Sequence, residues 1–194
     1  MRNAEFDREK VLRSAMIAFM DKGYAKTSMQ DLKAATGLHP GSIYCAFENK
    51  RGLLLAALGQ YREDRAQEFQ HFFSAERPKL VQLKNYLEHV VQECISCQAA
   101  QACLLIKALN ELAEQDDEVQ AILIENITNW QTSIEGVFSQ AIANKELVGE
   151  RSAAQLSRFF IMGIYGLRTY AQTHPQADVM HELAEQLFSD LCQE

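Results

Sequence analysis

The sequence has few residues that interrupt helices, and it has no apolar run long enough to cross a membrane. Only three prolines and nine glycines occur among its 194 residues, and we find neither the alternating pattern of a half-buried strand nor an internal repeat. The uncharged stretch Cys94–Ile106 is too short and too rich in glutamine to span a bilayer. These shortages favour an all-α protein that does not insert into membranes.

Export signals and common catalytic motifs are also missing. The first ten residues, MRNAEFDREK, contain no apolar core, so we expect no signal peptide. Five cysteines without such a signal indicate thiols in a reducing cytoplasm. A glycine-rich phosphate loop, an HExxH motif and a nucleophile elbow are all absent, which disfavours a small helical enzyme. We therefore expect a cytoplasmic protein that is not an enzyme and needs no cofactor and no metal.

The net charge of −7 alone argues against a nucleic-acid partner, but its distribution does not. Residues 1–60 carry nine Lys and Arg against six Asp and Glu, whereas the rest of the chain carries ten against twenty. A basic first part joined to an acidic remainder is expected when only one end of a protein meets phosphate.

Within the basic part, one stretch predicts two short helices joined by a tight turn: TSMQDLKAATGLHPGSIYCAFENK, residues 27–50. Ser28 is suited to cap the first helix, and Asp31 three residues later completes a capping-box pattern. Gly37 is suited to end that helix in a left-handed turn, and Pro40 to begin the second. The second helix buries Ile43 and Phe47 and leaves polar residues outward, as in a helix-turn-helix.

At these residues the chain resembles the DNA-binding head of TetR-family repressors. The matching positions of that family's motif are Gly37, Gly41, Tyr44, Phe47 and Lys50. The resemblance implies a three-helix DNA-binding head, residues 1–48, and a helical ligand-binding and dimerisation body, residues 49–194. It implies about nine helices in total, a homodimer, and a palindromic double-stranded operator as the partner.

The outward residues of the second short helix would enter the major groove. His39 and Ser42 are suited to bond base edges or phosphates, whereas Cys45 and Ala46 cannot make a bidentate base contact. The resemblance implies phosphate contacts for Tyr44 and Lys50. The full set that we predict to bind DNA is Thr27, Ser28, His39, Pro40, Gly41, Ser42, Tyr44, Cys45 and Lys50. For Thr27 and Ser28, simple helix capping is the alternative, and Arg51 is a weaker candidate for phosphate.

The remaining pattern is helical throughout. Asp7 is suited to cap a first helix of about fifteen residues that Gly23 ends. Apolar periodicity and cap signals then predict further helices at residues 50–73, 79–96, 103–113, from 116 onward, 152–173 and up to about 192.

By the same resemblance, residues 79–174 should enclose an effector pocket. The body has no basic cluster, so a small hydrophobic or aromatic effector of unknown identity is favoured over an anion. Single residues there are more often core than ligand contacts. The candidate lining residues are Tyr86, Cys94, Cys103, Ile106, Trp130, Phe159, Met162 and Tyr165.

The last two helices are the predicted dimer interface, through a four-helix bundle. Gly163 and Gly166 would permit close helix approach there, and closure of a monomeric core is the alternative. The predicted interface residues are Leu156, Phe160, Ile164, Leu167, Leu183, Leu187 and Leu191.

Cys94 and Cys97 share a helix face and Cys103 follows a turn, so a thiol sensor or a soft-metal site is an alternative to plain core packing. No matching histidine or second cysteine pair accompanies them, which disfavours zinc. The favoured hypothesis is a ligand-responsive transcriptional repressor. The alternative is a thiol-based redox regulator or helical redox protein.

Overall fold

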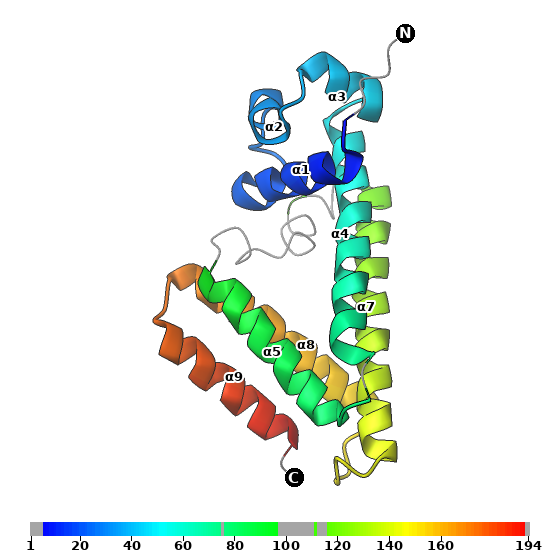
Figure 1. Ribbon diagram of the computed structural model, residues 1–194, viewed down its shortest axis with the longest axis vertical. Helices are drawn as coiled ribbons and strands as arrows, with labels where there is room; N and C mark the ends of the chain where they lie inside the picture. The colour runs from blue at the N-terminus through cyan, green and yellow to red at the C-terminus, as the bar shows by residue number, and fades with distance from the viewer. Residues whose placement is uncertain (1–5, 75, 97–110, 112–115, 193–194) are drawn as a thin grey trace. The chain divides into compact units, whose positions relative to one another are not determined.

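The computed structural model describes residues 6–74, 76–96, 111 and 116–192, and within them the chain is built from helices (Figure 1). No strand occurs in these residues, which confirms the predicted all-α fold. Residues 171–173 add a short 3-10 turn. The helices are α1 (Arg8–Lys22), α2 (Met29–Thr36), α3 (Pro40–Phe47), α4 (Lys50–Phe73), α5 (Lys79–Ser96), α7 (Asp117–Ala143), α8 (Ala153–Tyr170) and α9 (Ala177–Cys192).

The described helices follow the predicted boundaries closely. The predicted helix at residues 103–113 lies outside the described residues, apart from Glu111. None of the helices in the part of the chain described here is long and apolar enough to cross a membrane.

The chain divides into two compact units. Unit 1 comprises residues 1–67 and 104–124, and unit 2 comprises residues 68–103 and 125–194, so that α4 and α7 each contribute to both. The predicted domain border after residue 48 stays a prediction, because these units are defined by compactness and not by function.

In unit 1, local caps fix the first helix. The amide of Lys10 donates to Oδ1 of Asp7 at the start of α1 (3.0 Å), and the amide of Gly23 donates to the carbonyl of Phe19 at its end (2.9 Å). Gly23 has a φ of 79°, and a Cβ there would collide with the carboxylate of Glu111. The left-handed backbone therefore favours glycine at this position, whereas the Glu111 carboxylate is the movable end of a flexible side chain. The core of this unit includes Phe19, Leu32, Ile43, Leu53, Leu54 and Leu58.

In unit 2, α5, α8 and α9 lie side by side (Figure 1). A capping box formed by Ser152 and Gln155 starts α8. A Cβ at Gly163 would overlap the side chain of Leu187, so this glycine lets α8 and α9 approach closely within one chain. The core of the unit centres on Leu83, Leu87, Val90, Ile134, Phe138, Phe160 and Ile164.

Candidate functional site

The predicted helix-turn-helix is present, with the caps that the sequence indicates. The Asp31 amide donates to Oγ of Ser28 (3.2 Å), and the Ser28 amide donates back to Oδ2 of Asp31 (2.8 Å). Gly37 has a φ of 71°, and its amide donates to the carbonyl of Lys33 (3.0 Å) to end α2. Pro40 follows as the first residue of α3.

The helix α3 has one buried and one open side. Ile43 and Phe47 are buried in unit 1, while Cys45 is exposed and Tyr44 keeps 49% of its surface exposed. His39 caps the helix: the Gly41 amide donates to its Nδ1 (3.3 Å). The outward side of α3 thus consists of small and polar groups on a rigid support. Pro40 and Ser42 are half-buried next to it, and Gly41 is exposed.

Thr27 does not lie where the prediction put it. Its side chain is only 1% exposed, and its hydroxyl donates to the carbonyl of Gly23 (2.5 Å). Its amide donates to the same carbonyl (3.2 Å). The side chain is therefore buried in this conformation, and its hydroxyl bonds to the end of α1 and does not cap α2, where Ser28 is the N-cap. Ser28 stays exposed beside its capping role.

Lys50 begins α4 and lies against the turn after α1. Its Nζ is 4.4 Å from the ring centroid of Tyr24, a cation–π contact, and donates to the carbonyl of Ala25 (3.4 Å). Burial lowers the pKa of this ammonium group. Asn49 caps the start of α4, because the Gly52 amide donates to its Oδ1 (2.9 Å). One ammonium hydrogen reaches Ala25, which leaves two for a phosphate.

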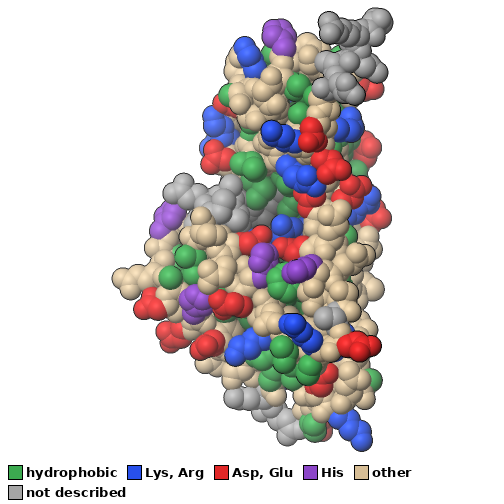
Figure 2. Space-filling model, in the orientation of Figure 1, with side chains coloured by type: hydrophobic (Ala, Val, Ile, Leu, Met, Phe, Trp, Pro, Cys, Tyr) green, Lys and Arg blue, Asp and Glu red, His purple; other side chains and the backbone are tan. Residues whose placement is uncertain are grey.

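Basic residues do not gather into one large patch on the visible face of unit 1. Figure 2 shows acidic and basic side chains next to one another there. Lys22 and Asp31 form an ion pair in this unit, with side chains 2.6 Å apart, and their hydrogen bond lowers the pKa of Asp31. Some of the basic side chains among the first sixty residues therefore pair with acidic side chains of the same unit.

The predicted pocket residues have different surroundings. Tyr86 and Cys94 are buried in the core of unit 2, whereas Cys103 and Ile106 lie outside the described residues. Trp130 and Tyr165 contact each other edge to face, with ring centroids 5.6 Å apart. A hollow of about 430 Å³ elsewhere in unit 2 is lined by Leu156, Leu191 and the connection between α7 and α8.

Two of the predicted pocket residues are exposed in the described part of the chain. Phe159 and Met162 are exposed on the outer side of α8, and Met162 keeps 60% of its surface accessible. They therefore do not line an interior pocket in the described part of the chain. Helical periodicity places Phe159 and Met162 on an apolar side of α8, but it does not show which side of the helix the rest of unit 2 covers.

Asn126 is a candidate ligand contact that the sequence reasoning missed. It lies on the buried side of α7, one helical turn before Trp130, and is only 7% exposed. Neither its amide oxygen nor its amide nitrogen has a hydrogen-bond partner within the described residues. An unpaired buried amide costs about 1–3 kcal/mol, so a water or a ligand group is expected to bind it. The sequence does contain a signal for this residue, because Asn126 is a polar side chain within a stripe of apolar residues.

Most of the predicted interface residues belong to the interior of the single chain. Leu156, Phe160, Ile164, Leu167 and Leu191 are buried in unit 2, which favours the core-closing alternative for these five. Leu187 packs on Gly163 of the same chain, and Leu183 alone of the seven is exposed. The outward apolar residues of α8 and α9 are instead Phe159, Met162, Tyr170 and Leu183.

The cysteine alternative gains no support from Cys94. This thiol is buried, and desolvation raises its pKa, whereas reactive cysteines have a lowered pKa and solvent access. Cys97 and Cys103 lie outside the described residues.

Comparisons with known proteins agree with this geometry. The profile of bacterial regulatory proteins of the tetR family matches residues 11–57, and that of the tetracyclin repressor-like C-terminal domain matches residues 80–187. The HTH-type transcriptional repressor ComR of Escherichia coli (strain K12) is 24% identical over 180 residues, which cover 92% of this chain and 86% of that protein. The transcriptional regulator AcuR of Cereibacter sphaeroides is 23% identical over 180 residues, covering 92% and 82%.

Solved structures share the fold. A cysteine mutant of the TetR-family regulator CifR, complexed with operator DNA, superimposes with a TM-score of 0.84 at 23% identity, over 97% of this chain and 98% of that one. A TetR-family regulator from Agrobacterium tumefaciens gives 0.86 at 19% identity, over 96% and 97%. With a C-terminal profile over more than half of the chain and a helix-turn-helix profile before it, this protein belongs to the TetR family of DNA-binding transcriptional regulators.

Proposed function

We propose that this protein is a repressor that binds a palindromic operator as a homodimer and leaves it when a small molecule binds unit 2. The observation that carries the proposal is the outward side of α3, which is held by caps at both ends of α2 and at the start of α3. A recognition helix must be rigid and open to solvent to enter a major groove.

The DNA contacts fall into two classes in this proposal. His39, Ser42 and Tyr44 face the groove and its phosphates, and Lys50 binds a phosphate at the start of α4. Helix N-termini favour anions, which supports a phosphate close to Lys50. Because Cys45 and Ala46 offer no bidentate donors, we expect few direct base contacts and a large share of backbone binding.

The effector that we propose is mostly apolar and carries one hydrogen-bonding group. Trp130 and Tyr165 supply an aromatic wall, and the unpaired amide of Asn126 lies one turn away from Trp130 on α7. A ligand group that both donates and accepts, such as an amide or a hydroxyl, would satisfy this side chain. A purely hydrophobic ligand would leave the amide of Asn126 without a hydrogen bond, so the polar group distinguishes the proposed effector from such a ligand.

Dimerisation is proposed to use the outer side of α8 and α9. Phe159, Met162 and Tyr170 recur there at spacings of three and eight residues, and Leu183 extends the apolar surface to α9. Gly166 lies on the same side with open space in front of its Cα, which would let a second helix come close. Burying such a stripe against a second copy is favourable in proportion to its apolar area.

The proposed switch uses α4, which begins at Lys50 in unit 1 and ends among the core aromatic residues of unit 2. A ligand shifts DNA affinity only if it binds the two states unequally. The usual coupling is about 1–3 kcal/mol and is reciprocal, so operator DNA should weaken effector binding by the same factor. The protein works in the cytoplasm in this proposal, and it catalyses no reaction.

A gel-shift assay of the purified protein with the DNA upstream of its own gene tests the proposal. We expect a salt-sensitive complex with one fragment that excess random DNA does not remove. Trp130, the only tryptophan, then reports effector binding by fluorescence with and without operator. Release of the complex by diamide alone, without any effector, would favour the redox alternative.

A further inference from the structure

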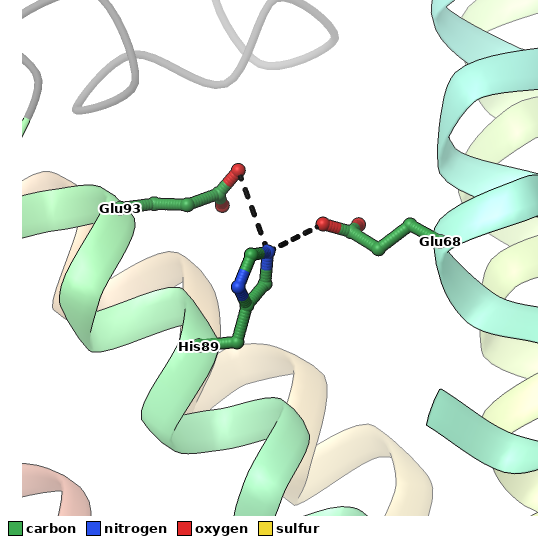
Figure 3. Close-up of side chains that lie close together, drawn as sticks. All are labelled: Glu68, His89 and Glu93. Atoms are coloured by element: carbon green, nitrogen blue, oxygen red, sulfur yellow. Dashed lines mark hydrogen bonds and ion pairs between the residues drawn. The ribbon is translucent and has the colours of Figure 1, made fainter. Parts of the chain in front are cut away.

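Three side chains of unit 2 that sequence reasoning did not connect converge on one point (Figure 3). His89 and Glu93 come from α5, and Glu68 comes from the last part of α4. Nε2 of His89 lies 2.6 Å from Oε1 of Glu68 and 3.9 Å from Oε1 of Glu93. One ring nitrogen thus faces two carboxylates.

This arrangement brings one more carboxylate to the imidazole than a simple ion pair uses. A single imidazole N–H has one hydrogen, which it directs at one acceptor. A second carboxylate at the same nitrogen adds charge repulsion between the two acids. A cation between the three groups would remove this repulsion and use all three as ligands.

We propose that Glu68, His89 and Glu93 form a binding site for one divalent transition-metal ion. Each residue offers one ligand atom, and the three atoms lie within 4.8 Å of one another. In a tetrahedral zinc site with bonds of about 2.0–2.2 Å, ligand atoms are about 3.3 Å apart. Small side-chain rotations therefore bring the observed separations to a coordinating geometry.

The spacing along α5 supports this site independently of the contact to α4. His89 and Glu93 are four residues apart, which places both on one face of the helix one turn apart. Two of the proposed ligands come from α5 and the third comes from α4, so helical backbone holds all three in place. Phe72 packs against the imidazole, with ring centroids 5.0 Å apart, and helps to fix its orientation.

Arg168 of α8 orients one of the three ligands. Its Nη2 donates to Oε2 of Glu93 (2.6 Å), and this leaves Oε1, the other oxygen of the same carboxylate, directed at His89. Outer groups that hold a ligand in this way are typical of metal sites. The same guanidinium also offsets part of the negative charge of the site.

The ligand chemistry indicates the class of ion. One imidazole nitrogen and two carboxylate oxygens suit Zn²⁺, Mn²⁺, Fe²⁺ or Co²⁺, while Mg²⁺ and Ca²⁺ prefer sites made of oxygen alone. The three side chains are only partly buried, so water is available to complete the coordination. The ion would tie the end of α4 to α5. This site is independent of the proposed DNA contacts and of Asn126.

Zinc binding by the full chain, first treated with EDTA, tests the proposal. Isothermal titration with ZnCl₂ should show one site per chain that is lost, or weakened at least about tenfold, in His89→Gln and in Glu93→Gln. Zinc should raise the melting temperature of the wild type and leave that of His89→Gln unchanged. MgCl₂ should not compete with zinc at equal concentration.

A matched control is available on α9, which packs against α5. His181 Nδ1 lies 3.2 Å from a single carboxylate, that of Glu88, so His181→Gln removes a histidine–glutamate pair of similar exposure. This variant should bind zinc like the wild type. Titration with Co²⁺ should give a visible spectrum without the charge-transfer absorption of a thiolate ligand, which separates this site from the cysteines.

Four results would overturn the proposal. The first three are the absence of zinc binding by the wild type, unchanged zinc affinity in both His89→Gln and Glu93→Gln, and a thiolate signature in the cobalt spectrum. The fourth is an equal loss in His181→Gln, because the effect would then not belong to this cluster.

Discussion

Arg51, in the first turn of α4, donates hydrogen bonds to the carboxylate of Asp116 from two nitrogens of its guanidinium group. Nη2 donates to Oδ1 of Asp116 (2.8 Å), Nε donates to Oδ2, and Nη2 also reaches Oε2 of Glu118 (2.6 Å). The positive charge of Arg51 is thus offset within unit 1, at the start of α7. These carboxylates occupy the guanidinium group, which disfavours the weaker prediction that Arg51 binds a DNA phosphate.

The first prediction concerns the pH dependence of this pair. The hydrogen bonds from Arg51 lower the pKa of Asp116 to about 2, with help from the Val119 amide. An unfolded aspartate has a pKa of about 3.9, so the pair adds stability above that value and loses it as the pH falls toward 2. Asp116→Asn should melt at a lower temperature than the wild type at pH 7, and this gap should shrink at pH 2–3.

Thermal unfolding followed by circular dichroism at a series of pH values measures this. Asp117→Asn changes the same charge at the next residue and serves as the control. A gap between Asp116→Asn and the wild type that stays constant down to pH 2 would contradict the assignment.

The second prediction tests the proposed phosphate contact of Lys50. Lys50→Ala should weaken binding to all DNA sequences alike and reduce the slope of log K against log salt by about one, since one phosphate contact is lost. Fluorescence anisotropy at several salt concentrations gives the slope. Lys145→Ala, in the connection between α7 and α8, should leave it unchanged. An unchanged slope for Lys50→Ala would remove this residue from the phosphate contacts.

The third prediction places the dimer interface on exposed residues. Replacing Met162 and Leu183 together by Glu should give a monomer that still folds, because both side chains face solvent in the single chain. Leu167→Glu would instead put a charge into the core and unfold the chain, so it cannot test dimerisation. Sedimentation measures the mass. The control is Val148→Glu, an exposed position in a connecting segment, and a dimeric double variant would move the interface elsewhere.

The fourth prediction concerns the unpaired amide of Asn126. Asn126→Leu should raise the free energy of unfolding by about 1–3 kcal/mol, because it removes two unsatisfied polar groups from the interior. The same change should abolish the effector's influence on DNA binding. Urea denaturation measures the first effect, and Asn129→Leu, on the exposed side of α7, is the control. A large loss of stability in Asn126→Leu would show that the amide has a partner in the folded chain.

The sequence predicts those parts of this fold that depend on local signals. The caps at Asp7 and Ser28, and the stops at Gly23 and Gly37, are each set by residues within one turn, and all are confirmed. The helix-turn-helix could be recognised for the same reason.

Features that depend on packing could not be predicted in this way. Periodicity shows that α8 has two apolar sides, but not that Leu167 faces the core while Met162 faces solvent. The sequence does not show that Thr27 is buried, because its hydroxyl donates to the carbonyl of Gly23 only once the chain has folded around it. In the cluster of Glu68, His89 and Glu93, 21 positions of the chain separate Glu68 from His89, and only tertiary structure brings these two together.

The most direct test of the account is a footprint of the protein on the DNA upstream of its own gene. Two protected half-sites of related, inverted sequence should appear with centres about 10 base pairs, or 34–36 Å, or a multiple of this apart, on one face of the duplex. The double variant Ser42→Ala, Tyr44→Ala should lose this protection while keeping the wild-type melting temperature. Absence of any protected site, or the same footprint from the double variant, would contradict the claim that α3 reads the operator.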